Sequence, residues 1–150
     1  MIEGGSAHNE AQNTAILSRL KDLLNQQIAH FHNYLTALEK QKAAIESGRG
    51  QDILAYIEIE EQIASDIFAI QKVIDPLKPA AEPEDIAACK ATLEDLKNRA
   101  VAQFENNSNL LAARMTEVGA EIAALRNNPL AAIARRSLLS NTASLVDIEG

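Results

Sequence analysis

The residue types that most often bind metals or catalyse reactions are few in this sequence, and their spacing suits neither role. His30 and His32 are two positions apart and would point to different sides of a helix, whereas His8 lies in a polar N-terminal stretch. Metal sites in helical bundles commonly use Glu-x-x-His pairs on two helices, because that spacing directs both ligands inward. The sequence contains no such pair, so we expect surface or boundary histidines and no bound metal.

Nucleophilic chemistry has equally little support. Ser18 and Lys21 have the Ser-x-x-Lys spacing of certain acyl enzymes, but the Ser-Asp-Asn and Lys-Thr-Gly motifs that accompany it there are missing. A glycine-rich phosphate loop, a His-Glu-x-x-His motif and EF-hand spacing are also absent. Cys89, the single cysteine, falls in an apolar row, which indicates a buried and inert thiol. We therefore expect a protein that is not an enzyme and binds no cofactor.

The acidic residues Glu58, Glu60 and Glu61 would point in different directions on a helix, which favours solvated charges over a cation site. Glu60 differs from the other two because it lies within an apolar row, as Lys21 and Lys42 do earlier in the chain. Charges in such a row either pair between helices and set their register, or reach solvent along the apolar surface. The sequence leaves both interpretations open.

The composition favours a single all-α domain. The 150 residues include 26 alanines and only six glycines and four prolines, and alanine is the residue that loses least on helix formation. The net charge of -7 and the five aromatic residues argue against nucleic-acid binding. The single cysteine predicts a reducing compartment, and hence a cytoplasmic protein. We expect no signal peptide, because no basic residue precedes an apolar block at the start, and no membrane insertion, because no apolar run approaches 18 residues.

The first long helix is predicted to follow a flexible lead-in at residues 1–12. We expect it to begin at Asn13 or Thr14 and to end at Gly48, which suits a left-handed C-cap. Most of the apolar residues of this helix form a row in which the spacing alternates between four and three, and Leu20, Leu23 and Tyr34 widen the row. The row comprises Leu17, Lys21, Leu24, Ile28, Phe31, Leu35, Leu38, Lys42 and Ile45.

A second helix, with Asp52 as its cap, should end before the prolines between Pro76 and Pro83. Apolar residues lie on two faces of this helix, which indicates that both faces are covered by other parts of the protein. The main face comprises Ile53, Tyr56, Glu60, Ile63, Ile67, Ile70, Ile74 and Leu77, and the second face comprises Leu54, Ile57, Ala64 and Phe68.

A third helix should begin where Glu84 and Asp85 complement the positive end of the helix dipole, and end near Asn127-Asn128-Pro129. The polar residues 106–109 predict a bend, a break or a solvent-facing patch. The apolar row of this helix begins with Ile86, Cys89, Leu93, Leu96 and Ala100. It then drifts by one position and continues with Val101, Phe104, Leu111, Met115, Val118, Ile122 and Leu125. The expected fold class is an all-α, elongated antiparallel bundle of three long helices over residues 13–127, with residues 128–150 as a short C-terminal amphipathic helix or tail.

Residues 35–74 have a distinctive layout. Leu-Thr-Ala-Leu-Glu at 35–39 is followed by Ser-Gly at 47–48, Asp-Ile-Leu at 52–54 and Ile-Glu-Ile-Glu-Glu-Gln-Ile at 57–63. This stretch resembles the FlgN family of bacterial flagellar export chaperones. A lysine that is common in the charged cluster of that family's second helix is missing here, because residues 58–62 read Glu-Ile-Glu-Glu-Gln. The resemblance implies a helical bundle that binds hook-filament junction proteins of the FlgK and FlgL type. It further implies that the protein prevents their premature assembly and delivers them to components of the flagellar type III export apparatus.

The C-terminal segment 128–150 is the candidate client-binding region. The resemblance places substrate binding there, and the residues agree, because a three-helix core can be completed by residues 14–127 and leaves the apolar residues of this segment unassigned. The candidate client-binding residues are Leu130, Ile133, Ala134, Leu138, Leu139, Leu145, Val146 and Ile148. Two alternatives remain open: the segment packs back on the bundle, or the protein is a self-associating coiled-coil structural or adaptor protein.

Overall fold

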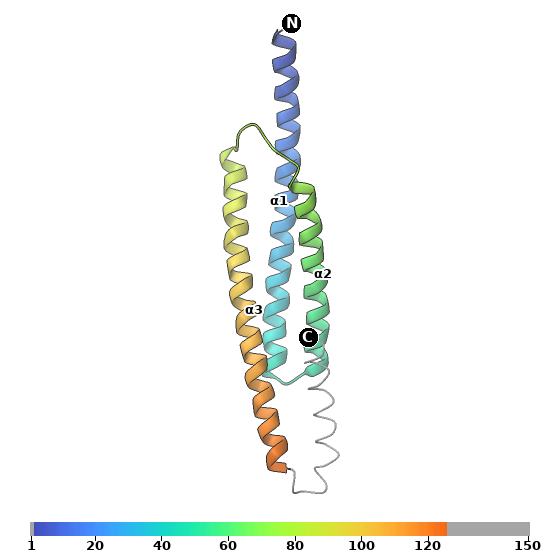
Figure 1. Ribbon diagram of the computed structural model, residues 1–150, viewed down its shortest axis with the longest axis vertical. Helices are drawn as coiled ribbons and strands as arrows, with labels where there is room; N and C mark the ends of the chain where they lie inside the picture. Colours follow the sequence, from blue (N-terminus) through green and yellow to red (C-terminus); the bar gives the residue numbers. More distant parts are fainter. Residues whose placement is uncertain (1, 126–150) are drawn as a thin grey trace. The chain divides into compact units, whose positions relative to one another are not determined.

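The structure is a computed structural model that describes residues 2–125, and within that range it contains three α-helices and no strand (Figure 1). Helix α1 spans Ile2–Glu46, α2 spans Gly50–Ile74 and α3 spans Glu84–Leu125. The predicted all-α class is confirmed. The predicted C-terminal segment, residues 128–150, lies outside the described residues.

The start of α1 differs from the prediction. The helix begins at Ile2 rather than at Asn13 or Thr14, so the expected lead-in is helical from its second residue. The Thr14 hydroxyl donates to the carbonyl of Glu10 at 2.9 Å, an i to i−4 bond that belongs to a continuous helix. Asn13 does not cap α1; its Oδ1 accepts a hydrogen bond from the backbone N–H of Ala80 at 3.0 Å. The side chain therefore satisfies a backbone group in the loop between α2 and α3.

The turn between α1 and α2 is a Schellman motif, as the glycine at position 48 predicted. Gly48 has a φ of 69°, its N–H bonds the carbonyl of Ile45, and the N–H of Arg49 bonds the carbonyl of Ala44 at 2.9 Å. Asp52 was expected to cap α2, and that prediction is wrong, because the helix begins at Gly50 and Asp52 lies in its first turn. There its carboxylate approaches Arg49 at 3.4 Å.

The proline-containing loop separates α2 from α3 as predicted. The last helical residue of α2 is Ile74, and the backbone N–H of Leu77 still bonds the carbonyl of Ile74 at 2.9 Å. Helix α3 begins at Glu84, with Asp85 also in its first turn, and the carbonyl of Pro83 accepts the N–H of Ala87. Proline needs no hydrogen-bond acceptor of its own, which makes it compatible with a helix boundary.

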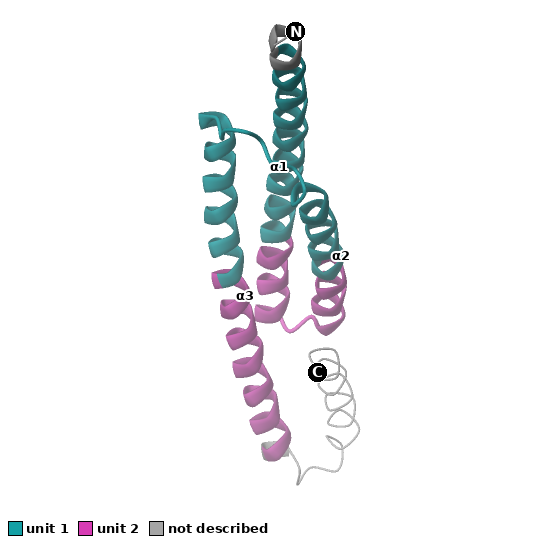
Figure 2. Cartoon of the chain, turned by 45° about the horizontal axis from the view of Figure 1, so that its top comes forward, with its two compact units in different colours: residues 1–36, 60–101 teal, residues 37–59, 102–150 magenta. Residues whose placement is uncertain are grey.

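The chain divides into two compact units, coloured separately in Figure 2. Unit 1 comprises Met1–Thr36 and Glu60–Val101, and unit 2 comprises Ala37–Ile59 and Ala102–Gly150. Each unit contains parts of all three helices and has its own apolar cluster. None of the described helices combines enough length and apolarity to cross a membrane.

The apolar cluster of unit 1 joins its three helical segments. Its buried members are Leu20, Leu23 and Leu24 of α1, Ile74 of α2 and Ile86 of α3. Half-buried side chains pack against them, namely Leu17, Ile70, Leu77, Cys89 and Leu93. Burying one such side chain fully stabilises a fold by about 1.5–3 kcal/mol, so this cluster is a main source of stability for unit 1.

The apolar cluster of unit 2 lies beside the Gly48 turn. Its buried members are Ala44 and Ile45 of α1, Ile53 of α2 and Leu111 of α3. Leu54, Tyr56, Ile57, Leu110 and Met115 pack against it. Ile45 and Ile53 come from opposite sides of the turn, so the reversal at Gly48 brings two apolar helix faces together.

The predicted row of α1 is confirmed in part. Leu24, Leu38 and Ile45 are buried as predicted, whereas Lys21 and Lys42 are exposed and Ile28 and Leu35 are only half-buried. The observed row alternates spacings of four and three and accepts amide side chains at two of its positions. Its buried members are Leu20, Leu24, Gln27, Leu38, Gln41 and Ile45.

The predicted drift of the α3 row into Val101 and Phe104 is wrong. Both side chains are exposed, and the buried row continues from Ala100 to Asn107 and Leu111. Helix α3 passes through residues 106–109 without a break, and Asn107 is buried rather than solvent-facing. The physical reason is that the low helix propensity of asparagine is offset when its side chain is satisfied by hydrogen bonds inside the bundle.

Candidate functional site

Three large apolar side chains of unit 1 are exposed. Phe68 is 66% exposed, and Val73 and Val101 are exposed by about half. The Nζ atom of Lys72 lies 5.4 Å from the centre of the Phe68 ring, within the range of a cation–π contact. The second face of α2 was expected to be covered at Ala64 and Phe68, and this prediction is wrong, because both are exposed in unit 1.

Unit 2 also carries apolar side chains on its outside. Ile59 of α2 is 46% exposed and Phe104 of α3 is 54% exposed. Single exposed apolar residues are normal on protein surfaces, but a half-exposed phenylalanine offers a large area to a binding partner. These side chains are the described residues best suited to a contact with another apolar helix.

A hydrogen-bonded amide joins α1 to α2 in the interior of unit 1. Gln27 is 3% exposed, and its Nε2 donates to Oε1 of Gln71 at 3.0 Å and to the carbonyl of Ile67 at 3.3 Å. Gln71 in turn donates to Asp75 at 2.7 Å. Because a buried amide is costly unless its hydrogen bonds are satisfied, these partners select one register of α1 against α2.

A second amide network joins α1 to α3 in the interior of unit 2. Asn107 donates from Nδ2 to the carbonyl of Leu38 at 2.8 Å and to Oε1 of Gln41 at 2.9 Å, and its Oδ1 accepts from Gln103 at 2.9 Å. Asn107 and Gln41 are both buried. Gln27, Gln41 and Asn107 were not among the predicted core residues, although their spacing within the rows of leucine and isoleucine is a usable signal.

Glu60 is the one buried carboxyl group among the described residues. Its side chain lies in the main row of α2, as predicted, and is 7% exposed. Burial raises the pKa of Glu60 to about 7, with a further contribution from the negative charge of Glu61. The pKa of Tyr34 on α1 is raised as well, mainly by burial and then by the charge of Glu60. Two interpretations were open for the charges in the apolar rows, and Glu60 fits neither of them. It does not extend to solvent, and Lys21 and Lys42 pair with other carboxylates.

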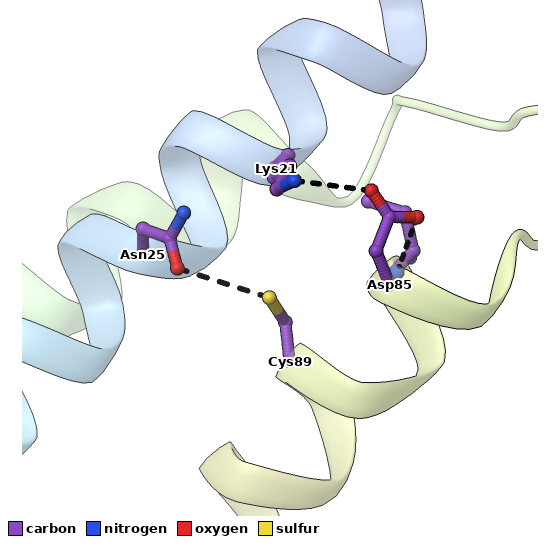
Figure 3. Close-up of polar contacts among 5 residues, drawn as sticks. Lys21, Asn25, Asp85 and Cys89 are labelled. Carbon is purple, nitrogen blue, oxygen red and sulfur yellow. Dashed lines mark hydrogen bonds and ion pairs between the residues drawn. The ribbon is translucent and has the colours of Figure 1, made fainter.

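Figure 3 shows Lys21 and Asn25 of α1 facing Asp85 and Cys89 of α3 in unit 1. The Nζ atom of Lys21 lies 3.2 Å from Asp85, so this lysine pairs between helices. The hydrogen bond from Lys21 is the main reason that the pKa of Asp85 is lowered. The Cys89 thiol lies 3.8 Å from Oδ1 of Asn25 and is half-buried beside the apolar cluster. The predicted place of Cys89 on an apolar face is confirmed, and its burial is partial.

A basic side chain from α3 lies at the C-terminal end of α1 in unit 2. The last turn of α1 has no basic residue of its own, but Nη2 of Arg114 would lie 3.3 Å from a Cβ placed on Gly48. A cation at this end complements the negative pole of the helix dipole. Arg114 also pairs with Glu117 at 2.9 Å. The arrangement stabilises the turn and has no catalytic geometry.

The described residues bring no three His, Cys, Asp or Glu side chains together in a way that could hold a metal ion. The candidate client-binding residues were placed at the C-terminal end of the chain, outside the range that the structure describes. These residues are Leu130, Ile133, Ala134, Leu138, Leu139, Leu145, Val146 and Ile148. Within residues 2–125, the features available for recognition are therefore the exposed apolar side chains on each unit.

No family model matches the sequence, and no solved structure matches the chain. A protein of Treponema pallidum (strain Nichols), described as uncharacterized, is 31% identical over 124 residues, and the match covers 78% of this chain and 80% of the relative. A match of this identity over most of both sequences reflects common descent. The chain therefore belongs to the same family as this Treponema pallidum protein.

Proposed function

We propose that this protein is a cytoplasmic, non-enzymatic chaperone of flagellar protein export, related to the FlgN family. It binds hook-filament junction proteins of the FlgK and FlgL type, keeps them from assembling early and delivers them to the type III export apparatus. The chain acts as an antiparallel helical bundle with a short C-terminal amphipathic helix. An amphipathic client helix and an apolar helix face recognise each other by burying both apolar surfaces, so no cofactor is required.

The helical hairpin at residues 37–59 is the observation that carries this proposal. In unit 2 this segment forms the end of α1, the Gly48 turn and the first turns of α2, with Ile45 and Ile53 packed in one cluster. This is the layout that the resemblance to the FlgN family implies for the same residues. The exposed Phe68 and Phe104 give further support, because each is an apolar side chain available to a helical partner.

The client-binding test is a calorimetric titration of the full-length chain with the terminal helical segment of a hook-filament junction protein. We expect stoichiometric binding that is abolished by Ile133→Glu or Leu138→Asp, with helicity unchanged by circular dichroism. Ala132→Glu is the matched control, because it adds the same charge on the opposite side of the predicted C-terminal helix. Failure of the unsubstituted chain to bind would contradict the chaperone function. Equal binding by all variants would instead move the site away from this segment.

A self-associating structural or adaptor protein is the second candidate. The observation that favours it is the exposure of Phe68 in unit 1 and of Phe104 in unit 2, which would be covered in an oligomer. Analytical ultracentrifugation of the purified chain distinguishes the two functions. A stable oligomer that does not bind the client segment supports the adaptor, whereas a monomer that forms a stoichiometric complex supports the chaperone.

A further inference from the structure

The Glu60 carboxyl group is enclosed without a partner for one of its oxygens. The side chain is 7% exposed, and Oε1 is inaccessible to solvent and has no hydrogen-bond partner. A buried carboxylate normally accepts hydrogen bonds or pairs with a cation, because water otherwise solvates it far better than the protein interior does. The surroundings of Glu60 therefore favour its neutral form.

The groups around Glu60 in unit 1 provide no compensating positive charge. Tyr34 of α1 is half-buried and close enough to feel the charge of Glu60, and Glu61 on α2 adds a second negative charge. On α3 the residues buried in unit 1 are Ile86, Leu96 and Ala100, none of which titrates. Lys97 and Arg99 of α3 are exposed, and among the described residues no lysine or arginine pairs with Glu60.

The location of Glu60 couples its charge to helix packing. It lies on the main face of α2 in unit 1 together with Ile67, whose carbonyl accepts a hydrogen bond from Gln27 of α1. The side chain of Gln71, also on α2, accepts a second hydrogen bond from Gln27. Water can reach Oε1 of an ionised Glu60 if the side chain swings out of the row or if α1 and α2 separate locally. Either movement removes contacts that hold the two helices together.

We propose that Glu60 is a pH-responsive packing element: its neutral carboxyl group allows α1 and α2 to close in unit 1, and its ionisation loosens that packing. The element works within the physiological range of pH and requires no ligand. It does not rest on the proposed chaperone function.

The direction in which stability changes with pH follows from the number of protons that the folded and unfolded states bind. The folded chain holds the Glu60 proton up to a pKa of about 7, whereas the ordinary value is 4.5, so the folded state binds more protons than the unfolded state between these limits. The stabilising contribution of Glu60 is then fully present below pH 4.5 and is lost as the pH rises through 7. From pH 5.5 to pH 8 the unfolding equilibrium constant should increase by about 25-fold through this group alone.

The test compares urea unfolding of the full-length chain at pH 5.5 and pH 8 with that of Glu60→Gln and Glu58→Gln. Glu58 is exposed on the same helix, so its substitution makes the same chemical change without touching the interior. All groups other than Glu58 and Glu60 are the same in the three proteins, so their contributions cancel in the comparison. We expect Glu58→Gln to keep the roughly 25-fold dependence and Glu60→Gln to lose most of it. Equal pH dependence in all three proteins would overturn the proposal.

A second measurement does not depend on whether Glu60→Gln folds. In the unsubstituted chain, carbon-13 NMR of the glutamate side-chain carboxyl groups reports each titration directly. A Glu60 midpoint near 7 supports the proposal if the protection of unit 1 amides against hydrogen exchange, corrected for the intrinsic pH dependence of exchange, falls over the same range. A midpoint near the ordinary 4.5 refutes it.

Discussion

Removing the Asn107 amide should destabilise unit 2 far more than removing that of its neighbour Asn106. Asn107 is 3% exposed and joins α3 to α1 through the Leu38 carbonyl and the Gln41 side chain. Asn106 is exposed on the same helix. The pair Asn107→Ala and Asn106→Ala therefore makes one chemical change in two environments.

The magnitude follows from what each substitution leaves behind. Asn107→Ala leaves Oε1 of buried Gln41 without the donor at 2.9 Å, and a buried polar group that loses its partner costs about 1–3 kcal/mol. Gln103 is only half-buried and can turn to water, and the Leu38 carbonyl keeps its place in the α1 ladder, so neither adds much. Both variants gain about 0.6 kcal/mol of helix propensity, which cancels in the comparison. We expect Asn107→Ala to be less stable than Asn106→Ala by about 2 kcal/mol.

The assay is urea unfolding followed by circular dichroism at 222 nm, with amide hydrogen exchange to locate the loss in unit 2. A third variant, Asn107→Leu combined with Gln41→Leu, should recover most of the stability, because it replaces both partners with apolar groups and leaves no orphaned amide. A difference below about 0.5 kcal/mol between the two alanine variants would refute the assigned network, since that is the scale of ordinary surface substitutions.

Three further predictions concern the turn, the ion pair and the exposed face. Gly48→Ala should lower the free energy of unfolding by about 1–2 kcal/mol, because the φ of Gly48 is 69°. Gly50→Ala is the control, because a Cβ at Gly50 meets nothing within 4 Å. Equal effects of the two substitutions would be inconsistent with the Schellman turn. The pKa of Asp85 is lowered by Lys21, so the stabilising effect of the Asp85 carboxylate should be present at neutral pH and disappear as the pH falls through the lowered pKa of the folded state. Asp85→Asn should remove this part of the loss of stability in acid. An unchanged dependence of the thermal unfolding temperature on acidic pH would contradict the pairing. Phe68→Ser should change stability by no more than about 0.5 kcal/mol, because the ring is exposed, and a large loss in thermal unfolding would show that the ring is covered.

Features that depend on neighbouring residues could be predicted from the sequence alone. Alanine content and long apolar rows predicted three helices, and the breaks were found because Gly48 and the prolines from Pro76 to Pro83 act through their own backbone geometry. The start of α1 was missed because a polar, glycine-containing stretch was read as a break, although its other residues favour helix.

The polar residues that face the core became evident only in the folded chain. The predicted rows of α1 and α3 follow the apolar residues, so they include Phe104, which is exposed, and omit Gln41 and Asn107, which are buried. An amide is stable inside a bundle only when partners from another helix satisfy it, and the partners of Asn107 lie 66 and 69 residues away in the chain. The same reasoning applies to Glu60, whose unusual proton affinity comes from enclosure by several helices rather than from its neighbours in sequence, Glu61 apart. Local chemistry therefore determined where this chain is helical, and long-range burial decided which of its polar groups carry the specificity of the packing.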